Sequence, residues 1–531
     1  MEALTERSDN ARSRHFVMTF ALDRSRLACG VRWLAPFLIL MLGYLLRVAF
    51  YREDYAHPDD AITIGVVGYM RSSGDWDTNW AKADLPPELR YPQYNFSSHL
   101  YGTYFFYRMV KLLPGLEHWR SAEGGRWVYR YFSILLATLV VAQTWWLTRR
   151  AAGELAAGFA GLLTAVVPLL VQDAHLMRPE AFVTALTLAA IGLSWPESRW
   201  RPGRVLAAAM VVGLLVASKV SLLPLLWVPL VPALAAAGTP RERRSRLAVA
   251  VVLTAVGSVA GFALGAPGAV AQPAHFWHGI EHLAAQYRGL HPPYSGLDGG
   301  PVGGMLLAYF ASTLGGTAVI ASALGVARLV RKRAGWICAL TLGPVAAYVI
   351  FFSFRSVFFE RNLSHVVPLF CLLAGVGAAA AVQWMAARLR VSVTPLAIAA
   401  ALALIARPVD ISRRLVWIDF SQDGTRQRNQ LESGLQARHS TEAWLIEELL
   451  TDQPVQRLEA HFAAGGPPVV LRAIDYHDPW SARAHAQFYE RLNSKLLGQW
   501  TSPFADVPPC TLHTYHGWTD RWFLVSGART P

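Results

Sequence analysis

Long apolar stretches alternate with short polar segments over residues 31–406 of this chain. A helix needs roughly 20 apolar residues to cross about 30 Å of hydrocarbon, and most of the stretches approach this length. The pattern therefore predicts a mostly α-helical polytopic membrane protein with about eleven transmembrane helices. Alternatively, the two stretches on either side of Lys219 form one tilted or re-entrant unit. The predicted spans are residues 31–50, 127–147, 152–171, 181–195, 205–217, 220–237, 247–270, 302–330, 336–352, 363–386 and 391–406.

Arginine clusters occupy every second gap between the predicted spans. Because Lys and Arg are enriched in cytoplasmic loops, this alternation predicts that the N-terminal segment 1–30 lies in the cytoplasm. The odd number of spans then places the tail, residues 407–531, on the other side of the membrane. Residues 31–406 form the membrane domain in this scheme. Its extracytoplasmic loops are residues 51–126, 172–180, 271–301 and 354–362.

The first of these loops and the tail are both expected to contain regular structure. Residues 97–113 are rich in aromatic side chains, which favour the headgroup region, so we expect a helix that lies in the membrane interface. The tail mixes polar and apolar residues and predicts a small α/β domain. Within it, Ser440 would begin a helix through residue 450 and Ser481 another through residue 497. Short strands are predicted at 468–473 and 522–525.

The composition agrees with a membrane protein and excludes other classes. Of the 531 residues, 53% are hydrophobic and only 16% are charged, whereas a soluble domain has about 25% charged residues. The formal net charge is +13. Its arginines fall between apolar stretches, as orientation signals do, and form no stripe that would bind nucleic acid. The four cysteines predict neither a disulfide framework nor a cysteine metal site.

The polar segment His57-Pro58-Asp59-Asp60 follows the first predicted span. Proline favours the first position of a helix and acidic residues in the first turn complement the helix dipole, so we expect a helix to begin here. Its N-terminus would help to keep a carboxylate ionised, which suits a general base. The alternative is an ordinary helix start with solvated acidic side chains. Carboxylates at a membrane exit are costly unless they line a polar cavity, and this favours a functional site.

Several motifs link this segment to a known superfamily. After residues 57–60 the chain continues with Tyr69-Met70 and with Ser-Gly-Asp-Trp at 73–76. This succession resembles the first outer loop of the GT-C glycosyltransferases, in the branch that contains the protein O-mannosyltransferases and the bacterial aminoarabinose transferases of lipid A. The family usually has Asp-Glu where this chain has Asp59-Asp60. Further segments are similar to the family in the same order, at residues 91–92, 130–133, 173–180, 218–219 and 360–368.

The resemblance implies a membrane glycosyltransferase of GT-C type. Such an enzyme moves a sugar from a polyprenyl-phosphate donor to a hydroxyl group of an acceptor, which is a membrane lipid, a glycan or a protein. The resemblance also implies inversion at the anomeric carbon, a bacterial inner (plasma) membrane location, and a periplasmic active site and tail. A base must take the acceptor proton in this reaction. We assign this role to Asp59, and to Asp60 the orientation of Asp59 or of the acceptor.

Cations are expected where negative charge develops on the leaving lipid phosphate. Lys219, at the tip of two apolar stretches, is the first candidate and Arg361 is the second. Alternatively, Lys219 snorkels at a helix end and Arg361 pairs with Glu360. Arg130, just inside the second span, is expected to orient the acidic pair. The other predicted substrate-binding residues are Tyr91, His175, Arg178 and Glu180.

The sequence does not establish a cofactor or a single function class. Asp59 and Glu180 could hold a divalent cation, because carboxylate oxygens suit Mg²⁺ or Mn²⁺ and added imidazole would suit Zn²⁺. A ligase or polymerase of lipid-linked saccharides would share the predicted topology. From a different class, a polytopic secondary transporter would also be embedded in the membrane. Transporters usually show internal repeats and ionisable residues near mid-membrane, and neither is apparent in this chain.

Overall fold

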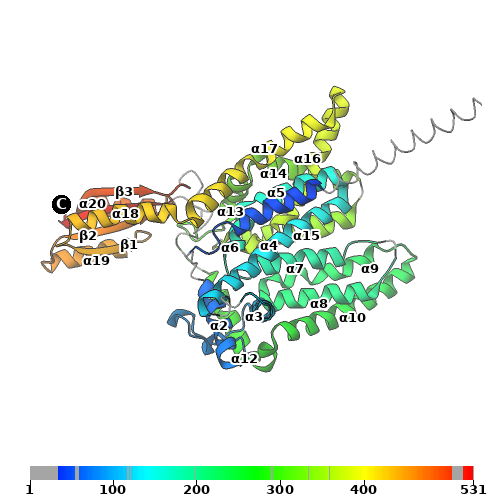
Figure 1. The fold of residues 1–531 in the computed structure, drawn as a ribbon, viewed down its shortest axis with the longest axis horizontal. Coiled ribbons are helices and arrows are strands. Elements are labelled where there is room, and N and C mark those ends of the chain that lie inside the picture. Colours follow the sequence, from blue (N-terminus) through cyan, green and yellow to red (C-terminus); the bar gives the residue numbers. More distant parts are fainter. Residues whose placement is uncertain are drawn as a thin grey trace, which may run out of the picture.

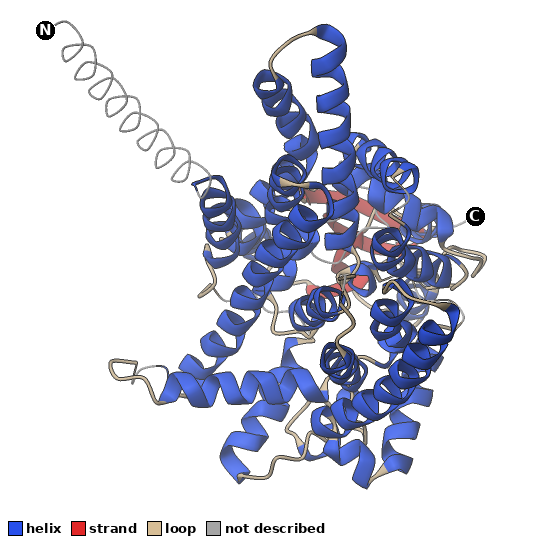
Figure 2. Ribbon diagram, turned by 90° about the vertical axis from the view of Figure 1, so that its right-hand side faces the viewer, coloured by secondary structure: helices blue, strands red, loops and turns tan. Residues whose placement is uncertain are grey.

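The computed structural model of this chain describes residues 34–53, 59–116, 119, 121–197, 199–288, 290, 292, 294–332, 334–357, 359–504 and 518–529. These residues form a bundle of helices and, at one end of the long axis, a small domain built on a sheet (Figure 1). A view turned by 90° shows that helices dominate the molecule (Figure 2). The expected mostly α-helical architecture with a small α/β part near the C-terminus is confirmed. Outside the described residues lie segment 1–30 and the predicted residues His57, Pro58, Cys29 and Cys510.

The bundle consists of the apolar helices that the hydrophobic pattern predicted. Five helices of the described residues are long and apolar enough to cross a membrane, or up to seven if two bent pairs each form one span. Shorter apolar helices occupy the remaining predicted spans, so each predicted span coincides with a helix, while the total of eleven stays a prediction. In chain order the helices are Leu34–Val48, α4 (Ala122–Ala152), α5 (Glu154–Val166), α6 (Pro168–His175), α7 (Glu180–Leu193), α8 (Pro202–Ser218), η5 (Val220–Leu230), α9 (Val231–Ala235), α10 (Pro240–Gly265), α13 (Gly303–Tyr309), η6 (Phe310–Leu314), α14 (Gly316–Arg331), α15 (Gly335–Ser353), α16 (Val367–Leu389) and α17 (Val393–Arg414).

Short helices gather at one end of the bundle. Figure 1 shows α2 (Asp60–Ser73), α3 (Ser97–Lys111) and α12 (Pro273–Gln286) at this end, where α2 packs against α3. The helix predicted at residues 97–113 is confirmed as α3, and its inner face packs against α4 and α8. The connecting segments contain η2 (Trp80–Lys82), η3 (Pro87–Leu89) and α11 (Pro267–Ala271).

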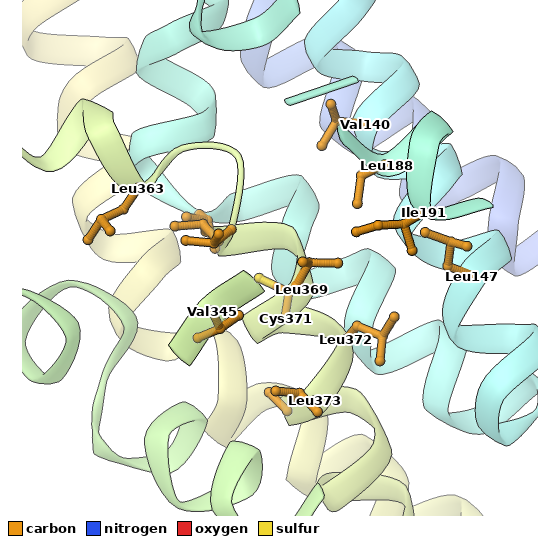
Figure 3. Packing of buried hydrophobic residues seen from close by; sticks show 14 of the residues in the cluster. Val140, Leu147, Leu188, Ile191, Val345, Leu363, Leu369, Cys371, Leu372 and Leu373 are labelled. Carbon is orange, nitrogen blue, oxygen red and sulfur yellow. The ribbon is translucent and has the colours of Figure 1, made fainter. Parts of the chain in front are cut away.

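Helix α16 lies at the centre of the bundle because it carries small and apolar residues all around. It packs against α4, α5 and α14. A Cβ atom at Gly377 would collide with the carbonyl oxygen of Ala321 on α14, so glycine permits the close approach of these helices, as small residues do in membrane bundles. Leu369, Leu372 and Leu373 of α16 enter the same core as buried residues of α4 and α7 (Figure 3).

A bend of 51° separates α5 from α6 at Pro168. Proline has no N–H to donate to the carbonyl four residues earlier, and the bend leaves the last carbonyl groups of α5 without helical donors. The buried guanidinium of Arg47, on the first described helix, donates to two of these carbonyl oxygens, at 2.8 and 3.1 Å. The hydroxyl of Ser412 on α17 donates to the next one at 2.7 Å. These side chains replace the missing backbone donors and hold the bend.

Replacing Arg47 by Met is expected to destabilise the protein because it removes these donors from inside the bundle. Each buried carbonyl left without a donor costs about 1–3 kcal/mol. The free energy of unfolding of the detergent-solubilised protein, measured by titration with a denaturing detergent, would show the loss. Arg413→Met, on the exposed side of α17, is the matched control and should change stability by less than about 1 kcal/mol. Equal effects of the two substitutions would contradict this role of Arg47.

The small domain has a four-stranded mixed sheet with strand order β1-β2-β4-β3. Strand β1 pairs with β2 in parallel, and the β2–β4 and β4–β3 pairs are antiparallel. The strands predicted at 468–473 and 522–525 are confirmed as β2 and β4, both longer than predicted. The elements are α18 (Asp423–Arg438), β1 (Ala443–Glu448), α19 (Gln453–Ala463), β2 (Val469–Asp475), α20 (Pro479–Arg491), β3 (Leu492–Thr501) and β4 (Thr519–Ala528).

Two predictions about this part of the chain were wrong, and a third is not settled by the structure. The helix predicted from Ser440 through residue 450 is strand β1, because parallel pairing with β2 overrides a local helix preference. The helix predicted from Ser481 through residue 497 is capped by Asp478 and ends at Arg491, where β3 begins. The last predicted span ended at residue 406, but α17 continues to Arg414 and passes into η8 (Leu415–Phe420). The division of the chain at residue 407 therefore stays a prediction and falls within a continuous helix.

Candidate functional site

Asp59 directly precedes α2, and its carboxylate faces two arginines from other parts of the chain. Its Oδ2 lies 3.1 Å from Nη1 of Arg361 and 3.9 Å from Nη1 of Arg178. Arg361 belongs to η7 (Glu360–Leu363), which precedes α16, and Arg178 to the loop between α6 and α7. Three segments that are distant in the sequence thus converge on one carboxylate.

Arg178 connects this carboxylate to two further acidic side chains. Its side chain is 3% exposed and lies 3.2 Å from Oδ1 of Asp173 and 3.5 Å from Oε2 of Glu180. Glu180, the first residue of α7, also accepts a hydrogen bond of 3.3 Å from Nζ of Lys219. Buried charges are tolerated when each has a partner of opposite sign. This series of alternating charges provides such partners, so the predicted residues Asp59, Arg178, Glu180 and Lys219 form one network.

The loop that carries Arg178 is attached to α2 by two hydrogen bonds. Oδ1 of Asp60 accepts from the backbone N–H of Met177 at 2.8 Å, and the hydroxyl of Thr63 donates to the Met177 carbonyl at 2.5 Å. The residue Asp60 is 1% exposed, whereas the Asp59 side chain keeps 27% of its surface exposed. Of the two predicted acids, Asp59 is therefore the accessible one and Asp60 is in a position to hold the loop.

Lys219 lies where α8 ends and η5 begins. The preceding residue, Ser218, accepts hydrogen bonds from the backbone N–H groups of Phe96 at its carbonyl (3.0 Å) and of His99 at its hydroxyl (3.2 Å). These bonds fix the turn against α3. The ammonium group of Lys219 meets Glu180 inside the network, a contact that favours a site residue over a lysine that snorkels towards the membrane surface.

Arg361 pairs with Asp59, and its neighbour Glu360 does not compete for it. Burial raises the pKa of Glu360 to about 8, which disfavours the charged carboxylate that would attract Arg361. Burial by itself would lower the pKa of Arg361, but the negative charges of Asp59 and Glu180 raise it above its usual value. Arg361 therefore remains a cation beside the Asp59 carboxylate.

A cavity of about 420 Å³ opens beside these charges, a volume in the range of small-molecule sites. One carboxylate, that of Glu180, and several cationic side chains line it together. The cations are Lys219, Arg288, Arg355 and Arg361. Much of the remaining wall is apolar, with Ile280, Leu283, Phe351, Phe352 and Phe359. This combination fits an anionic group attached to an apolar chain.

Comparison with known proteins places the fold. Neither a protein-family model nor a curated protein sequence matches this chain. Among solved structures, ArnT from Cupriavidus metallidurans in the apo state matches with a TM-score of 0.52 and 14% sequence identity, over 93% of this chain and 98% of that chain. The chain has the ArnT fold. The fold that the motifs predicted is thereby confirmed.

Two other solved structures match less closely. ArnT from the same organism, bound to undecaprenyl phosphate, has a TM-score of 0.49 and 15% identity, over 93% of this chain and 98% of that chain. The apo oligosaccharyltransferase of Archaeoglobus fulgidus has a TM-score of 0.49 and 14% identity, over 72% of this chain. The match covers 55% of that protein, so this chain spans about half the length of the oligosaccharyltransferase.

Within the ArnT fold of this chain, Arg130 contacts the segment that leads to the acidic pair. Its guanidinium, on α4, donates to the backbone carbonyls of Tyr51 (2.8 Å) and Glu53 (3.0 Å). Sequence reasoning expected Arg130 to orient Asp59 or Asp60. These two contacts lie on the backbone before the acidic pair, and the predicted role of Arg130 stays a prediction.

Two predicted substrate-binding residues lie elsewhere. The ring of His175 stacks on Phe420 with centroids 3.8 Å apart, and its Nε2 lies 3.4 Å from the carbonyl oxygen of Leu46. The ring of Tyr91 lies 4.2 Å from that of His282 on α12. Neither residue belongs to the described set that lines the cavity, so both remain predictions as substrate contacts.

Sequence reasoning missed three residues of this region. Arg288 and Arg355 line the cavity, and Asp173 holds Arg178. A signal was available for the two arginines, because both lie in loops that were predicted to be extracytoplasmic, 271–301 and 354–362. Their convergence could not be derived, because it depends on how α12 and α15 pack.

Within the described residues, no metal centre forms around the predicted ligands Asp59 and Glu180. Both carboxylates face guanidinium or ammonium groups. In the part of the chain that the structure describes, no three side chains of His, Cys, Asp and Glu lie close enough together to hold a metal ion. The divalent cation stays a hypothesis, and activity after exhaustive chelation tests it, since an essential ion would make the activity disappear.

Proposed function

We propose that this chain is a membrane glycosyltransferase that moves a sugar from a polyprenyl-phosphate donor to a hydroxyl group of an acceptor. The cavity carries the proposal, because it combines cations with apolar walls, and one of those cations, Arg361, contacts the accessible carboxylate of Asp59. A lipid-linked phosphate requires both kinds of surface. ArnT from C. metallidurans, whose fold this chain has, has also been solved with undecaprenyl phosphate, a ligand of this chemical class.

Asp59 would act as the general base. The acceptor O–H gives its proton to the Asp59 carboxylate while the acceptor oxygen bonds to the anomeric carbon of the sugar. The bond between that carbon and the phosphate oxygen breaks, and polyprenyl phosphate leaves with the electron pair. Attack from the face opposite the phosphate inverts the anomeric centre. A positioned base contributes about 10²–10⁴-fold to such a reaction.

The cations of the cavity would stabilise the leaving phosphate. Lys219 and Arg361 are held by Glu180 and Asp59 before the donor binds, so little reorganisation is needed when charge develops on the phosphate oxygens. Arg178 lies deeper, and we assign it the task of keeping Asp59 and Glu180 ionised. Asp60 and Arg130 would position the loops that carry these groups.

We further propose that the site faces the periplasm at the bacterial inner membrane, with residues 407–531 on the same side. The alternating arginine clusters support this orientation. The acceptor would be a membrane lipid, a glycan or a protein, and the small C-terminal domain is near enough to take part in its selection, since Trp480 donates a hydrogen bond of 2.6 Å to the Ser295 carbonyl.

Mass spectrometry of lipids that co-purify with the protein tests the proposal. A polyprenyl-phosphate sugar, together with loss of that sugar when acceptor is added, is the expected result. Ion-coupled uptake of a solute into liposomes, without chemical change of the solute, would overturn it in favour of a secondary transporter.

Replacing Lys219 by Ala is expected to weaken donor use more than acceptor use, because an ammonium contact to the phosphate is lost. A hydrogen bond to a charged group contributes about 1.5–3 kcal/mol, so the KM for the donor should rise roughly tenfold or more. Steady-state kinetics in nanodiscs with each substrate varied in turn would measure this. Lys332→Ala, at an exposed position away from the cavity, is the control. An unchanged KM for the donor in the Lys219 variant would argue against the phosphate contact.

A further inference from the structure

A second cationic pocket lies between α2 and α3, apart from the cavity that contains Lys219. Its volume is about 340 Å³. It is near the end of α2 that is remote from Asp59, and a helix of 14 residues is about 21 Å long. Three cationic side chains line the pocket and, among the described lining residues, no acidic one does. The lining residues are Gly68, Arg71, Ser72, Tyr104, Tyr107, Arg108 and Lys111.

Among the described residues, tyrosines hold the arginines of this pocket in place. Arg71 donates to the hydroxyl of Tyr129 at 3.0 Å and lies 4.2 Å from the ring centroid of Tyr107. Arg108 donates to the hydroxyl of Tyr104 at 3.2 Å. Phenol groups position a guanidinium without neutralising it. The positive charge of the pocket is therefore retained, and several donors remain for an anion.

An exposed apolar stripe runs along α3 next to the pocket. Phe105, Met109 and Leu112 follow one another at helical spacing and are 49%, 54% and 82% exposed. Trp76, itself exposed, packs edge-on against Phe105 with ring centroids 5.3 Å apart. Arg108 and Lys111 lie on the adjacent face of the same helix. A helix with an apolar stripe beside cations is typical of a membrane interface, and a stripe of this kind marks a contact surface.

We propose that this pocket binds the phosphate of an anionic membrane lipid whose acyl chains lie along the stripe of Phe105, Met109 and Leu112. Three cations at close range match a phosphate monoester better than a zwitterionic headgroup, whose own ammonium they repel. The stripe provides apolar surface for the chains at the place where they leave such a headgroup. The site is separate from sugar transfer and does not depend on it.

The test is a titration of the delipidated full-length protein in detergent, followed by native mass spectrometry. Short-chain phosphatidic acid should bind roughly tenfold tighter than short-chain phosphatidylcholine, and Arg108→Gln/Lys111→Gln should weaken phosphatidic acid about tenfold or more through the loss of charge-assisted hydrogen bonds. Arg438→Gln/Arg483→Gln removes the same charge from exposed positions of the small domain and should change binding less than about twofold. Equal affinities for phosphatidic acid and phosphatidylcholine would overturn the proposal. So would an equal loss of phosphatidic acid affinity in the two double variants.

Two further arms distinguish a lipid from soluble phosphate. Met109→Ser/Leu112→Ser should weaken phosphatidic acid and leave the affinity for inorganic phosphate unchanged. If inorganic phosphate alone binds as tightly as the short-chain lipid, the acyl chains contribute nothing to binding. The proposal that the ligand is a membrane lipid is then wrong. Should the Arg108 variant not fold, Lys111→Gln alone provides the test, since Lys111 is exposed at the end of α3.

Discussion

Asp59→Asn is expected to lower sugar transfer by about 10²–10⁴-fold while the protein still folds and inserts. The amide has nearly the same shape as the carboxylate but cannot take a proton from the acceptor hydroxyl. The protein should tolerate the substitution, because Arg178 still contacts Asp173 and Glu180, and Arg361 is 24% exposed to solvent. The measurement is kcat in nanodiscs with a polyprenyl-phosphate sugar identified by lipid analysis.

Two control variants distinguish the loss of the general base from a structural effect of the substitution. Asp84→Asn, an exposed acid of the same loop, should leave kcat unchanged. Asp60→Asn retains an oxygen that can accept the Met177 N–H and should cost much less activity than Asp59→Asn. Full turnover by the Asp59 variant would remove this residue from the mechanism. If Asp60→Asn lowers kcat more than Asp59→Asn does, Asp60 would be the general base and Asp59 the positioning residue.

Arg178→Met is expected to lower the free energy of unfolding by about 3–5 kcal/mol, because removal of one partner leaves buried charges uncompensated. Asp173 and Glu180, 3.2 and 3.5 Å from the guanidinium, are both buried and would lose the cation between them. Sugar transfer should be lost as well. Unfolding of the detergent-solubilised protein, followed by helix content during a denaturing-detergent titration, measures the effect.

An exposed ion pair offers the matched comparison. Arg149 lies 2.7 Å from Glu154 with both side chains partly exposed, and Arg149→Met should cost less than about 1 kcal/mol. In addition, Asp173→Asn should restore part of the stability of the Arg178 variant, because it removes one of the unpaired charges; a double-mutant cycle would show this coupling. Equal losses at Arg149 and Arg178, or no coupling with Asp173, would contradict the network described above.

The site residues that belong to short, recognisable motifs could be predicted from the sequence. Asp59, Arg178, Glu180, Lys219 and Arg361 were all singled out from the sequence, and the structure brings them into one network. Their pairing was not predictable. Arg361 was weighed as a partner of the adjacent Glu360, but burial raises the pKa of Glu360 and the guanidinium lies 3.1 Å from Asp59.

Other residues carry no local signal. In the sequence, Arg47 is an arginine near the end of an apolar stretch. Its neighbours in the sequence do not indicate that it donates hydrogen bonds to the carbonyl groups of Thr164 and Ala165 at the bend before Pro168. Strand β1 was predicted as a helix, since Ser440 and the residues after it resemble a helix start. Its partner β2 follows only after α19, and local preferences cannot include a neighbour that distant.

The amino-acid sequence was sufficient to place the apolar helices and the short helix α3, and to single out Asp59, Arg178, Glu180, Lys219 and Arg361. These follow from the length of apolar runs, helical spacing and residue chemistry, which are local properties. The folded structure was needed to show which carboxylate is accessible, which arginine meets it, and that Arg288 and Arg355 complete the cavity. Those outcomes depend on the direction of each side chain and on the packing of helices far apart in the chain, and burial then sets which groups keep their charge.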